Sequence, residues 1–146
     1  MLKIISHSEK QTFNLGKKLA KQFKGGKVVG LIGELGAGKT VLIKGVAAGL
    51  GIKKTITSPT FVLMKVYKIK DLRFKIKSFI HVDAYRLESG RDLIDIGLKD
   101  WLCQSNTITV IEWADRVKSI LPKNTITIKI KMGKKKNERI INILQR

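Results

Sequence analysis

The stretch Gly33-Glu34-Leu35-Gly36-Ala37-Gly38-Lys39-Thr40 decides the fold of this chain, because it fills every fixed position of the pattern G-x-x-x-x-G-K-[ST]. Residues 27–32, just before it, form a short apolar run that predicts a buried strand. Residues 39–50 predict a helix that ends at Gly51. A strand, a glycine-rich loop and a helix in this order are the context in which the pattern forms a phosphate-binding loop.

Such a loop binds phosphate through groups that lie close together in the sequence. Glycines let the backbone wrap closely around an anion, and successive N–H groups then point inward. The N-terminus of the following helix adds partial positive charge at the same place. We expect Lys39 to reach the β- and γ-phosphates of a nucleoside triphosphate and the Thr40 hydroxyl to bind the accompanying Mg²⁺. The alternative is a glycine-rich turn that binds no phosphate.

Length and composition predict one domain spanning residues 1–146, with an ordinary hydrophobic content of 43%. The sequence has no apolar run long enough to cross a bilayer and no signal-peptide pattern. A single cysteine, Cys103, excludes an internal disulfide and is interpreted as a packing residue. These features predict a cytoplasmic protein without a membrane partner.

The chain carries a formal net charge of +19. Its lysines are spread along the sequence, with two denser segments at residues 65–77 and 129–136. Neither segment interleaves aromatic residues regularly, as a base-stacking surface would. The charge permits contact with tRNA or another RNA, and a solvated basic face is the alternative.

The N-terminal part predicts a short strand at residues 2–5 followed by a helix. Two overlapping capping boxes, Ser6 with Glu9 and Ser8 with Gln11, can each start this helix, and the sequence does not choose between them. Four residues at helical spacing form its buried stripe. They are Thr12, Leu15, Leu19 and Phe23.

Beyond the motif helix, residues 53–59 predict a loop rich in hydroxyl side chains. Residues 61–69 and 74–82 predict an antiparallel hairpin, and residues 125–131 and 138–144 predict a second one at the C-terminus. Between the hairpins we expect two short helical pieces broken at Gly97 and a short helix at residues 114–121. The predicted class is α/β: a P-loop NTPase fold in one domain, with a mixed sheet, antiparallel hairpins and flanking helices.

Two further apolar strands end in carboxylates. Residues 79–82 lead to Asp83, and residues 107–111 lead to Glu112. A carboxylate after a buried strand is the usual second element of an NTPase site. One of the two is expected to ligate the metal and the other to orient the attacking water. Periodicity does not assign these roles, and either residue could instead be a strand-end acid that pairs with a basic side chain.

Several motifs occur together in the order known from one family. The chain resembles TsaE (formerly YjeE), the bacterial ATPase of tRNA threonylcarbamoyladenosine biosynthesis. The resemblance covers residues 31–113. It rests on the loop at residues 33–40, Ser58-Pro59-Thr60-Phe61, His81-Val82-Asp83-Ala84-Tyr85-Arg86-Leu87, Ile96-Gly97-Leu98 and Ile111-Glu112-Trp113.

The resemblance implies a protein that binds Mg²⁺ and ATP, hydrolyses ATP slowly and works with the partner proteins TsaB and TsaD. It makes Glu112 and Thr40 the metal ligands, and Asp83 the group that orients water or supports the ligands. Lys39, Asp83 and Glu112 are then the catalytic set. Trp113 lies beside the nucleotide or a partner, or else packs in the core. The implied nucleotide-binding residues are Glu9, Gly33, Glu34, Leu35, Gly36, Ala37, Gly38, Lys39, Thr40 and Val41.

Three other functions are compatible with a P-loop. A small-molecule kinase needs an arginine-bearing lid, for which only Arg86 and Arg91 are suitably placed. A GTPase is disfavoured because no Asn-Lys-x-Asp sequence is present. A basic RNA-binding protein with a vestigial loop is the third. Because the chain shows no clear arginine finger, we expect ATP hydrolysis that is weak alone and stimulated by partners.

Overall fold

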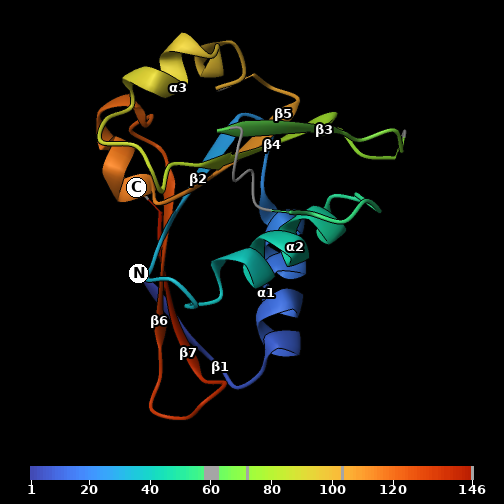
Figure 1. Cartoon of the computed structure of the whole chain (residues 1–146). Helices are drawn as coiled ribbons and strands as arrows, with labels where there is room; N and C mark the ends of the chain where they lie inside the picture. The colour runs from blue at the N-terminus through green and yellow to red at the C-terminus, as the bar shows by residue number, and fades with distance from the viewer. Residues whose placement is uncertain (58–62, 72, 103, 146) are drawn as a thin grey trace.

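The computed structural model describes residues 1–57, 63–71, 73–102 and 104–145. Its strands form one seven-stranded mixed sheet in the order β1-β7-β6-β2-β5-β4-β3 (Figure 1). The strands are β1 (Leu2–Ser6), β2 (Lys27–Ile32), β3 (Met64–Lys68), β4 (Ser78–Asp83), β5 (Thr107–Glu112), β6 (Ile126–Met132) and β7 (Arg139–Leu144). The helical segments are α1 (Glu9–Gln22), α2 (Lys39–Gly49), α3 (Arg91–Asp95), η1 (Leu98–Asp100) and η2 (Ala114–Ile120).

The middle of the sheet is parallel and its edges are antiparallel. Strand β2 pairs in parallel with β5 and β6, and β4 pairs in parallel with β5. The two predicted hairpins, β3–β4 and β6–β7, add antiparallel strands on either side, and β1 pairs with β7. Strands β4 and β5 are buried along nearly their whole length, as expected for strands covered on both faces. The predicted fold class is confirmed.

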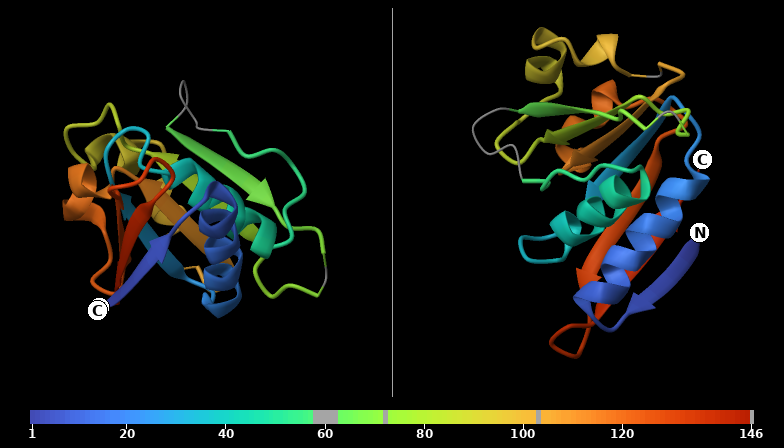
Figure 2. Two further views of the ribbon diagram at one scale, coloured as in Figure 1. Left: turned by 90° about the horizontal axis from the view of Figure 1, so that it is seen from below. Right: turned by 90° about the vertical axis from the view of Figure 1, so that its right-hand side faces the viewer.

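Helices cover both faces of the sheet. Helices α1 and α2 pack side by side on one face, while α3, η1 and η2 lie over the other (Figures 1 and 2). Each face has its own hydrophobic cluster, centred on residues such as Ile43 and Phe79 on the first and Ile80 and Leu93 on the second. The site described below therefore stands on a sheet that is buried on both faces.

Close packing of α1 against α2 depends on glycine. A Cβ atom added at Gly45 would come within 2.0 Å of the Phe13 carbonyl oxygen, and one added at Gly16 within 2.4 Å of the Leu42 carbonyl oxygen. Both atoms belong to backbone that cannot move aside. The helix that carries the phosphate-binding loop is thus held directly by the N-terminal helix.

The start of α1 resolves the choice between the two capping boxes. Ser8 is the N-cap, and its hydroxyl accepts a hydrogen bond from the Gln11 backbone N–H at 3.1 Å. The Gln11 side chain accepts from the backbone N–H of His7 at 2.8 Å rather than from that of the cap residue. The Ser6 hydroxyl instead contacts the Thr12 hydroxyl at 2.7 Å. Both serine side chains form hydrogen bonds, but only Ser8 caps the helix.

Some predicted boundaries were wrong. The strand expected at residues 74–82 begins only at Ser78, and residues 74–77 belong to the β3–β4 connection, in which the Asp71 carbonyl accepts the Phe74 N–H at 3.2 Å. The helix expected at residues 114–121 is 3₁₀, with non-helical angles at Val117. Within the described part of the strand expected at residues 61–69, β3 covers Met64–Lys68. Residues 58–62, including the Ser-Pro-Thr-Phe motif, and Cys103 lie outside the described residues.

Among the helices of the described chain, none combines the length and the apolar character that a membrane crossing requires.

Candidate functional site

Three parallel strands bring their carboxyl ends to one edge of the sheet. Strand β2 leads directly into the phosphate-binding loop, β5 ends at Glu112 and β4 ends at Asp83. The strand register places Glu112 between Leu31 and Asp83. The loop and both predicted carboxylates therefore meet at the place where ligands of open α/β sheets bind.

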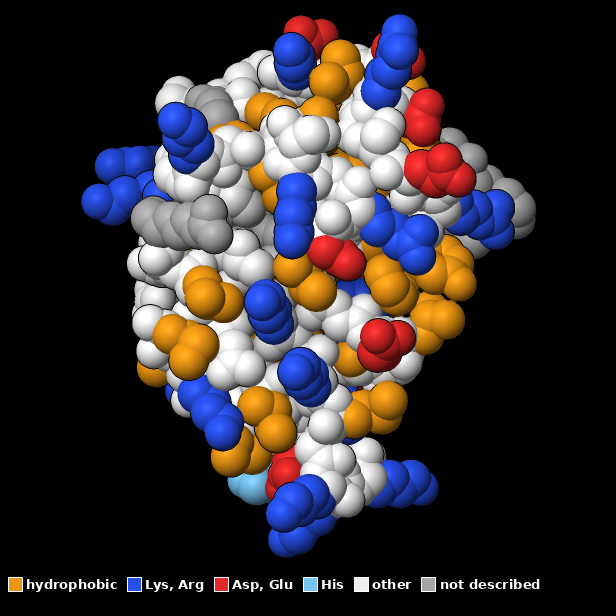
Figure 3. Space-filling model, turned by 90° about the vertical axis from the view of Figure 1, so that its left-hand side faces the viewer, with side chains coloured by type: hydrophobic (Ala, Val, Ile, Leu, Met, Phe, Trp, Pro, Cys, Tyr) orange, Lys and Arg blue, Asp and Glu red, His pale blue; other side chains and the backbone are white. Residues whose placement is uncertain are grey.

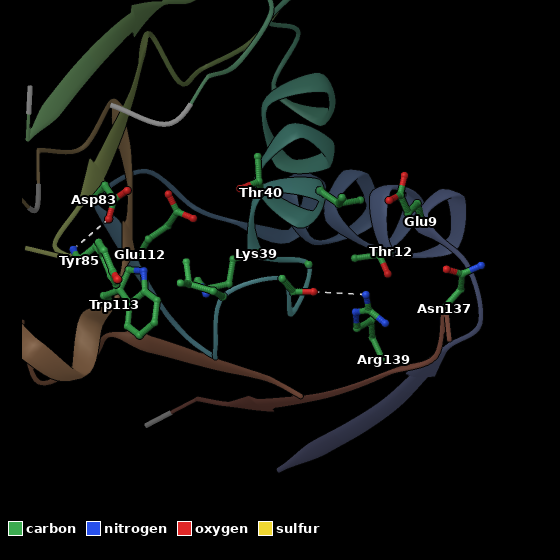
Figure 4. Close-up of a pocket in the computed structure, with 14 residues that line it drawn as sticks. Glu9, Thr12, Lys39, Thr40, Asp83, Tyr85, Glu112, Trp113, Asn137 and Arg139 are labelled. Carbon is green, nitrogen blue, oxygen red and sulfur yellow. Dashed lines mark hydrogen bonds between the residues drawn. The ribbon is translucent and has the colours of Figure 1, made fainter. Parts of the chain in front are cut away.

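A cavity of about 490 Å³ opens at this edge (Figure 4). It is large enough for a small-molecule ligand. Its lining residues come from the loop, from both carboxylate strands, from α1 and from the C-terminal hairpin. They are Glu9, Thr12, Leu35, Gly36, Gly38, Lys39, Thr40, Val41, Asp83, Tyr85, Glu112, Trp113, Asn137 and Arg139.

The loop has the backbone conformation that an anion nest requires. Gly36 and Gly38 have φ angles of 78° and 101°, which residues with a side chain rarely adopt. Gly38 is the N-cap of α2, and no side chain caps this helix end. The N-terminal N–H groups of α2 and its dipole are therefore directed at the cavity that Gly38 and Thr40 line.

Lys39 lies at the first position of α2, and 6% of its surface is exposed. Its ammonium group donates hydrogen bonds to the carbonyl oxygens of Gly33 and Glu34, the latter at 2.8 Å. Burial lowers the pKa of Lys39 below its usual value, and the carboxylates of Glu112 and Asp83 oppose this shift. A partly desolvated ammonium aimed into a cavity is a strong binding group for phosphate.

Glu112 is buried, with 4% of its surface exposed, and beside it lies His81, which is fully buried. His81 Nε2 lies 2.9 Å from Glu112 Oε2. The imidazole is therefore the donor, because an ionised carboxylate only accepts. No described residue gives His81 Nδ1 a hydrogen-bond partner. The hydrogen bond from His81 therefore fixes the orientation of the Glu112 carboxylate.

Asp83 lies across from Glu112 in a less buried position. Its Oδ1 accepts a hydrogen bond from the Tyr85 N–H at 2.9 Å (Figure 4). The two carboxylates point toward the cavity from neighbouring strands, and Thr40 faces them from α2. Carboxylate and hydroxyl oxygens are the ligands that Mg²⁺ prefers.

Aromatic side chains form one wall. Among the described residues, Trp113 is the only non-glycine with a positive φ, 58°. This is an uncommon conformation for a bulky residue. Its ring lies 4.4 Å from the Lys39 ammonium and 5.0 Å from the Tyr85 ring. Arg116 lies over both rings at 5.4 and 5.6 Å. Trp113 thus packs partly against the core and also faces the cavity.

The opposite end of the cavity contains residues that the motifs do not reveal. Arg139 begins β7, and its Nη2 donates a hydrogen bond to the Gly36 carbonyl oxygen at 3.3 Å (Figure 4). Its register opposite Ser6 places it beside the start of α1. Glu9, for which the resemblance implied nucleotide contact, lies at the same end, together with Thr12 and Asn137.

Not every predicted residue lines the cavity. Gly33 and Glu34 belong to the loop and support Lys39 through their carbonyl oxygens, whereas Ala37 is buried in the core. Arg86 and Arg91, the candidates for a kinase lid, are exposed and outside the lining. Within the described ranges, no three His, Cys, Asp or Glu side chains are grouped as a metal site. A metal ion here would need ligands beyond the protein carboxylates, such as phosphate oxygens and water.

The fold and this site define a P-loop protein with a mixed sheet. A family model described as "Threonylcarbamoyl adenosine biosynthesis protein TsaE" matches residues 6–141. The "tRNA threonylcarbamoyladenosine biosynthesis protein TsaE" of Treponema pallidum is 41% identical over 132 residues, which is 90% of this chain and 92% of that protein. The protein of the same name from Bacillus subtilis is 36% identical over 121 residues, covering 83% of this chain and 72% of that one.

A solved structure agrees with these comparisons. The crystal structure of Bacillus subtilis YdiB superposes with a TM-score of 0.80 at 30% identity and covers 99% of this chain and 84% of that chain. The chain belongs to the TsaE family, whose members take part in tRNA threonylcarbamoyladenosine biosynthesis.

Proposed function

We propose that the chain binds ATP with Mg²⁺ in the cavity at the carboxyl edge of the sheet and hydrolyses it slowly on its own. A partner complex of the TsaB–TsaD type raises the rate. The observation that carries the proposal is the register of the sheet, which brings Asp83 and Glu112 side by side against the glycine loop.

The residues present fit the phosphate groups of a nucleotide. Gly36 and Gly38 supply a wrapped backbone, α2 supplies a helix N-terminus, and Lys39 supplies a buried ammonium. Phosphate oxygens can replace the Gly33 and Glu34 carbonyl oxygens as acceptors for Lys39. The wrapped loop and the helix N-terminus are already in position before ligand arrives, so that the main rearrangement on binding is this exchange of acceptors by Lys39.

Thr40 and Glu112 would hold Mg²⁺ together with phosphate oxygens and water. When bound, the metal ion neutralises negative charge that develops on the phosphates. His81 fixes the Glu112 carboxylate in one orientation, so that its free oxygen is directed to the cavity. Asp83 accepts a proton from, or orients, the water that attacks the terminal phosphate.

The opposite end of the cavity is suited to the nucleoside part. Thr12, Asn137 and Arg139 offer hydrogen-bonding groups there, and the cavity lining also includes the apolar side chains of Leu35 and Val41. Arg139 already contacts the loop, but it lies away from the two carboxylates (Figure 4). Arg139 is therefore placed to bind the nucleotide rather than to stabilise charge beside the attacking water. Because no arginine among the described lining residues lies beside that water, we expect the isolated chain to hydrolyse ATP slowly.

Steady-state ATP hydrolysis tests the proposal. The wild-type chain should turn over ATP far below about one per second alone, and faster when a TsaB–TsaD complex is added. Lys39→Ala should abolish both rates, while Lys44→Ala, an exposed lysine of the same helix, should change neither. Turnover of about ten per second by the isolated chain, with no gain from partners, would contradict the proposal.

A further inference from the structure

A second cavity, distinct from the nucleotide site, is lined by lysines. It has a volume of about 770 Å³ and runs between the segment after α2, the edge strand β3 and the β3–β4 loop. We call it the lysine groove. Its lining residues are Gly51, Ile52, Lys53, Lys54, Lys65, Val66, Tyr67, Lys68, Lys70 and Asp71.

The positive charge of the lysine groove is not neutralised within the described chain. Five lysines line it, against the single acid Asp71. Asp71 is already bound by the Arg73 guanidinium, with Nη2 at 2.6 Å from Oδ2 and Nε at 3.0 Å from Oδ1. This pairing lowers the pKa of Asp71 to about 2, so the carboxylate stays ionised and engaged with Arg73. No ion pair between described residues includes a groove lysine.

The lysines come from separate segments. Lys65 donates a hydrogen bond to the Thr57 hydroxyl at 2.8 Å, and Lys68 lies 5.1 Å from the Trp101 ring. Lys53, Lys54 and Lys70 are exposed. Lysines on an edge strand often serve only to prevent strand addition. Lys53 and Lys54 are not on that strand, so edge protection does not account for the convergence of five charges.

One other face of the molecule differs from this groove. The face of the molecule shown in Figure 3 carries Lys and Arg side chains that are scattered, with acidic and hydrophobic side chains between them. The groove thus concentrates charge that is dispersed on that face. A groove of one sign raises the local concentration of an oppositely charged partner.

We propose that the lysine groove binds the phosphodiester backbone of RNA. Phosphate groups suit a cluster of compact ammonium groups, and Tyr67 adds a half-buried ring to the groove lining, of the kind on which RNA bases stack. An acidic polypeptide is the competing partner. The groove lysines attract either polyanion, and the family's part in tRNA modification favours RNA.

The proposal goes beyond ATP chemistry. The choice of RNA draws on the family's part in tRNA modification, and it does not depend on whether the chain hydrolyses ATP. A groove apart from the cavity would let one molecule hold a nucleotide and an RNA at the same time.

The test is fluorescence anisotropy with a labelled, unmodified tRNA transcript and nucleotide-free protein. The groove variant is Lys53→Gln/Lys54→Gln/Lys70→Gln, whose three sites are exposed. The matched control is Lys118→Gln/Lys123→Gln/Lys129→Gln, which removes the same charge from exposed positions outside the groove. Thermal unfolding and ATP titration of both variants show whether the fold and the nucleotide site remain intact.

The wild type should bind the transcript, and the logarithm of its affinity should fall linearly with the logarithm of the salt concentration. The groove variant should lose on the order of tenfold or more in affinity at about 0.1 M salt, and its salt slope should fall by about 2, because three phosphate contacts are lost. The control variant should bind nearly as well as the wild type.

Three outcomes would overturn the proposal. One is no transcript binding by a wild type that binds ATP. Another is an equal loss in the groove and control variants, which would show diffuse attraction by net charge. The third is binding of labelled poly-glutamate as tightly as the transcript with the same dependence on the groove lysines, which would indicate an acidic protein instead. Failure of ATP binding with transcript binding retained would count against the proposed function alone.

Discussion

The cavity at the carboxyl edge of the sheet and the lysine groove use charge in opposite ways. In the cavity, charged groups such as Lys39 and Glu112 are almost fully buried and each is held by a specific partner. In the groove, Lys53, Lys54 and Lys70 are exposed. Buried, oriented charges favour chemistry at one point, whereas exposed charges attract an extended polyanion in a salt-dependent way. Substitutions in the two regions should therefore have effects of different size and kind.

Among the residues around the phosphate loop other than Lys39, the largest effect is expected at Glu112. Glu112→Ala should lower partner-stimulated ATP turnover on the order of a thousandfold and weaken Mg²⁺-dependent ATP binding more than Asp83→Ala does. The reason is the burial of Glu112 and its fixed orientation on His81, compared with the more exposed Asp83. Calorimetric titration of both variants with and without Mg²⁺ measures the difference. Equal losses would contradict the assignment of different roles to the two carboxylates.

His81→Ala should cost about 3 kcal/mol of folding free energy, because it removes the donor beneath a buried carboxylate. Urea unfolding measures this loss. His81→Gln retains an amide donor and should recover part of the stability and of the ATP affinity. A His81→Ala protein as stable as the wild type would show that the Glu112 carboxylate finds another partner or water.

Arg139→Ala should weaken ATP binding about tenfold, since a charged hydrogen bond contributes roughly that much. Lys136→Ala removes an exposed cation from the same hairpin and should leave the affinity unchanged. Fluorescence titration with a labelled ATP analogue compares them. If both variants lost affinity equally, the positive charge of the hairpin would explain the binding, and the specific contact that we assign to Arg139 would be contradicted.

The smallest effect on ATP is expected from the groove. The Lys53→Gln/Lys54→Gln/Lys70→Gln protein should bind ATP within about twofold of the wild type, since distant sites act independently. The same titration applies. A marked loss of ATP affinity would show that the two regions are coupled and would remove the contrast between them.

The sequence was informative wherever local pattern determines structure. The loop at residues 33–40 lies between β2 and α2 as expected, and strands β4 and β5 end at Asp83 and Glu112. Both hairpins were also predicted, because two segments of alternating apolar residues joined by a short polar connection usually pair as an antiparallel hairpin. The family resemblance was confirmed by the comparisons.

Features that depend on distant pairing were not predictable. Arg139 lies about a hundred residues from the loop that it contacts, and the pairing of β7 with β6, and of β6 with β2, brings it there. Likewise, the His81–Glu112 hydrogen bond joins two strands, and neither sequence segment alone reveals it. The lysine groove combines residues before, within and after β3, so a one-dimensional charge count could not separate it from a solvated face.

The most direct test of the account is calorimetric titration of Mg²⁺–ATP into the wild type, Lys39→Ala and Lys44→Ala. The wild type and Lys44→Ala should bind one ATP per chain with similar affinity, and Lys39→Ala should lose at least about a hundredfold, because the buried ammonium is the main cationic side chain directed at the phosphates. Retention of full affinity by a folded Lys39→Ala protein would contradict the assignment of this cavity as an ATP site.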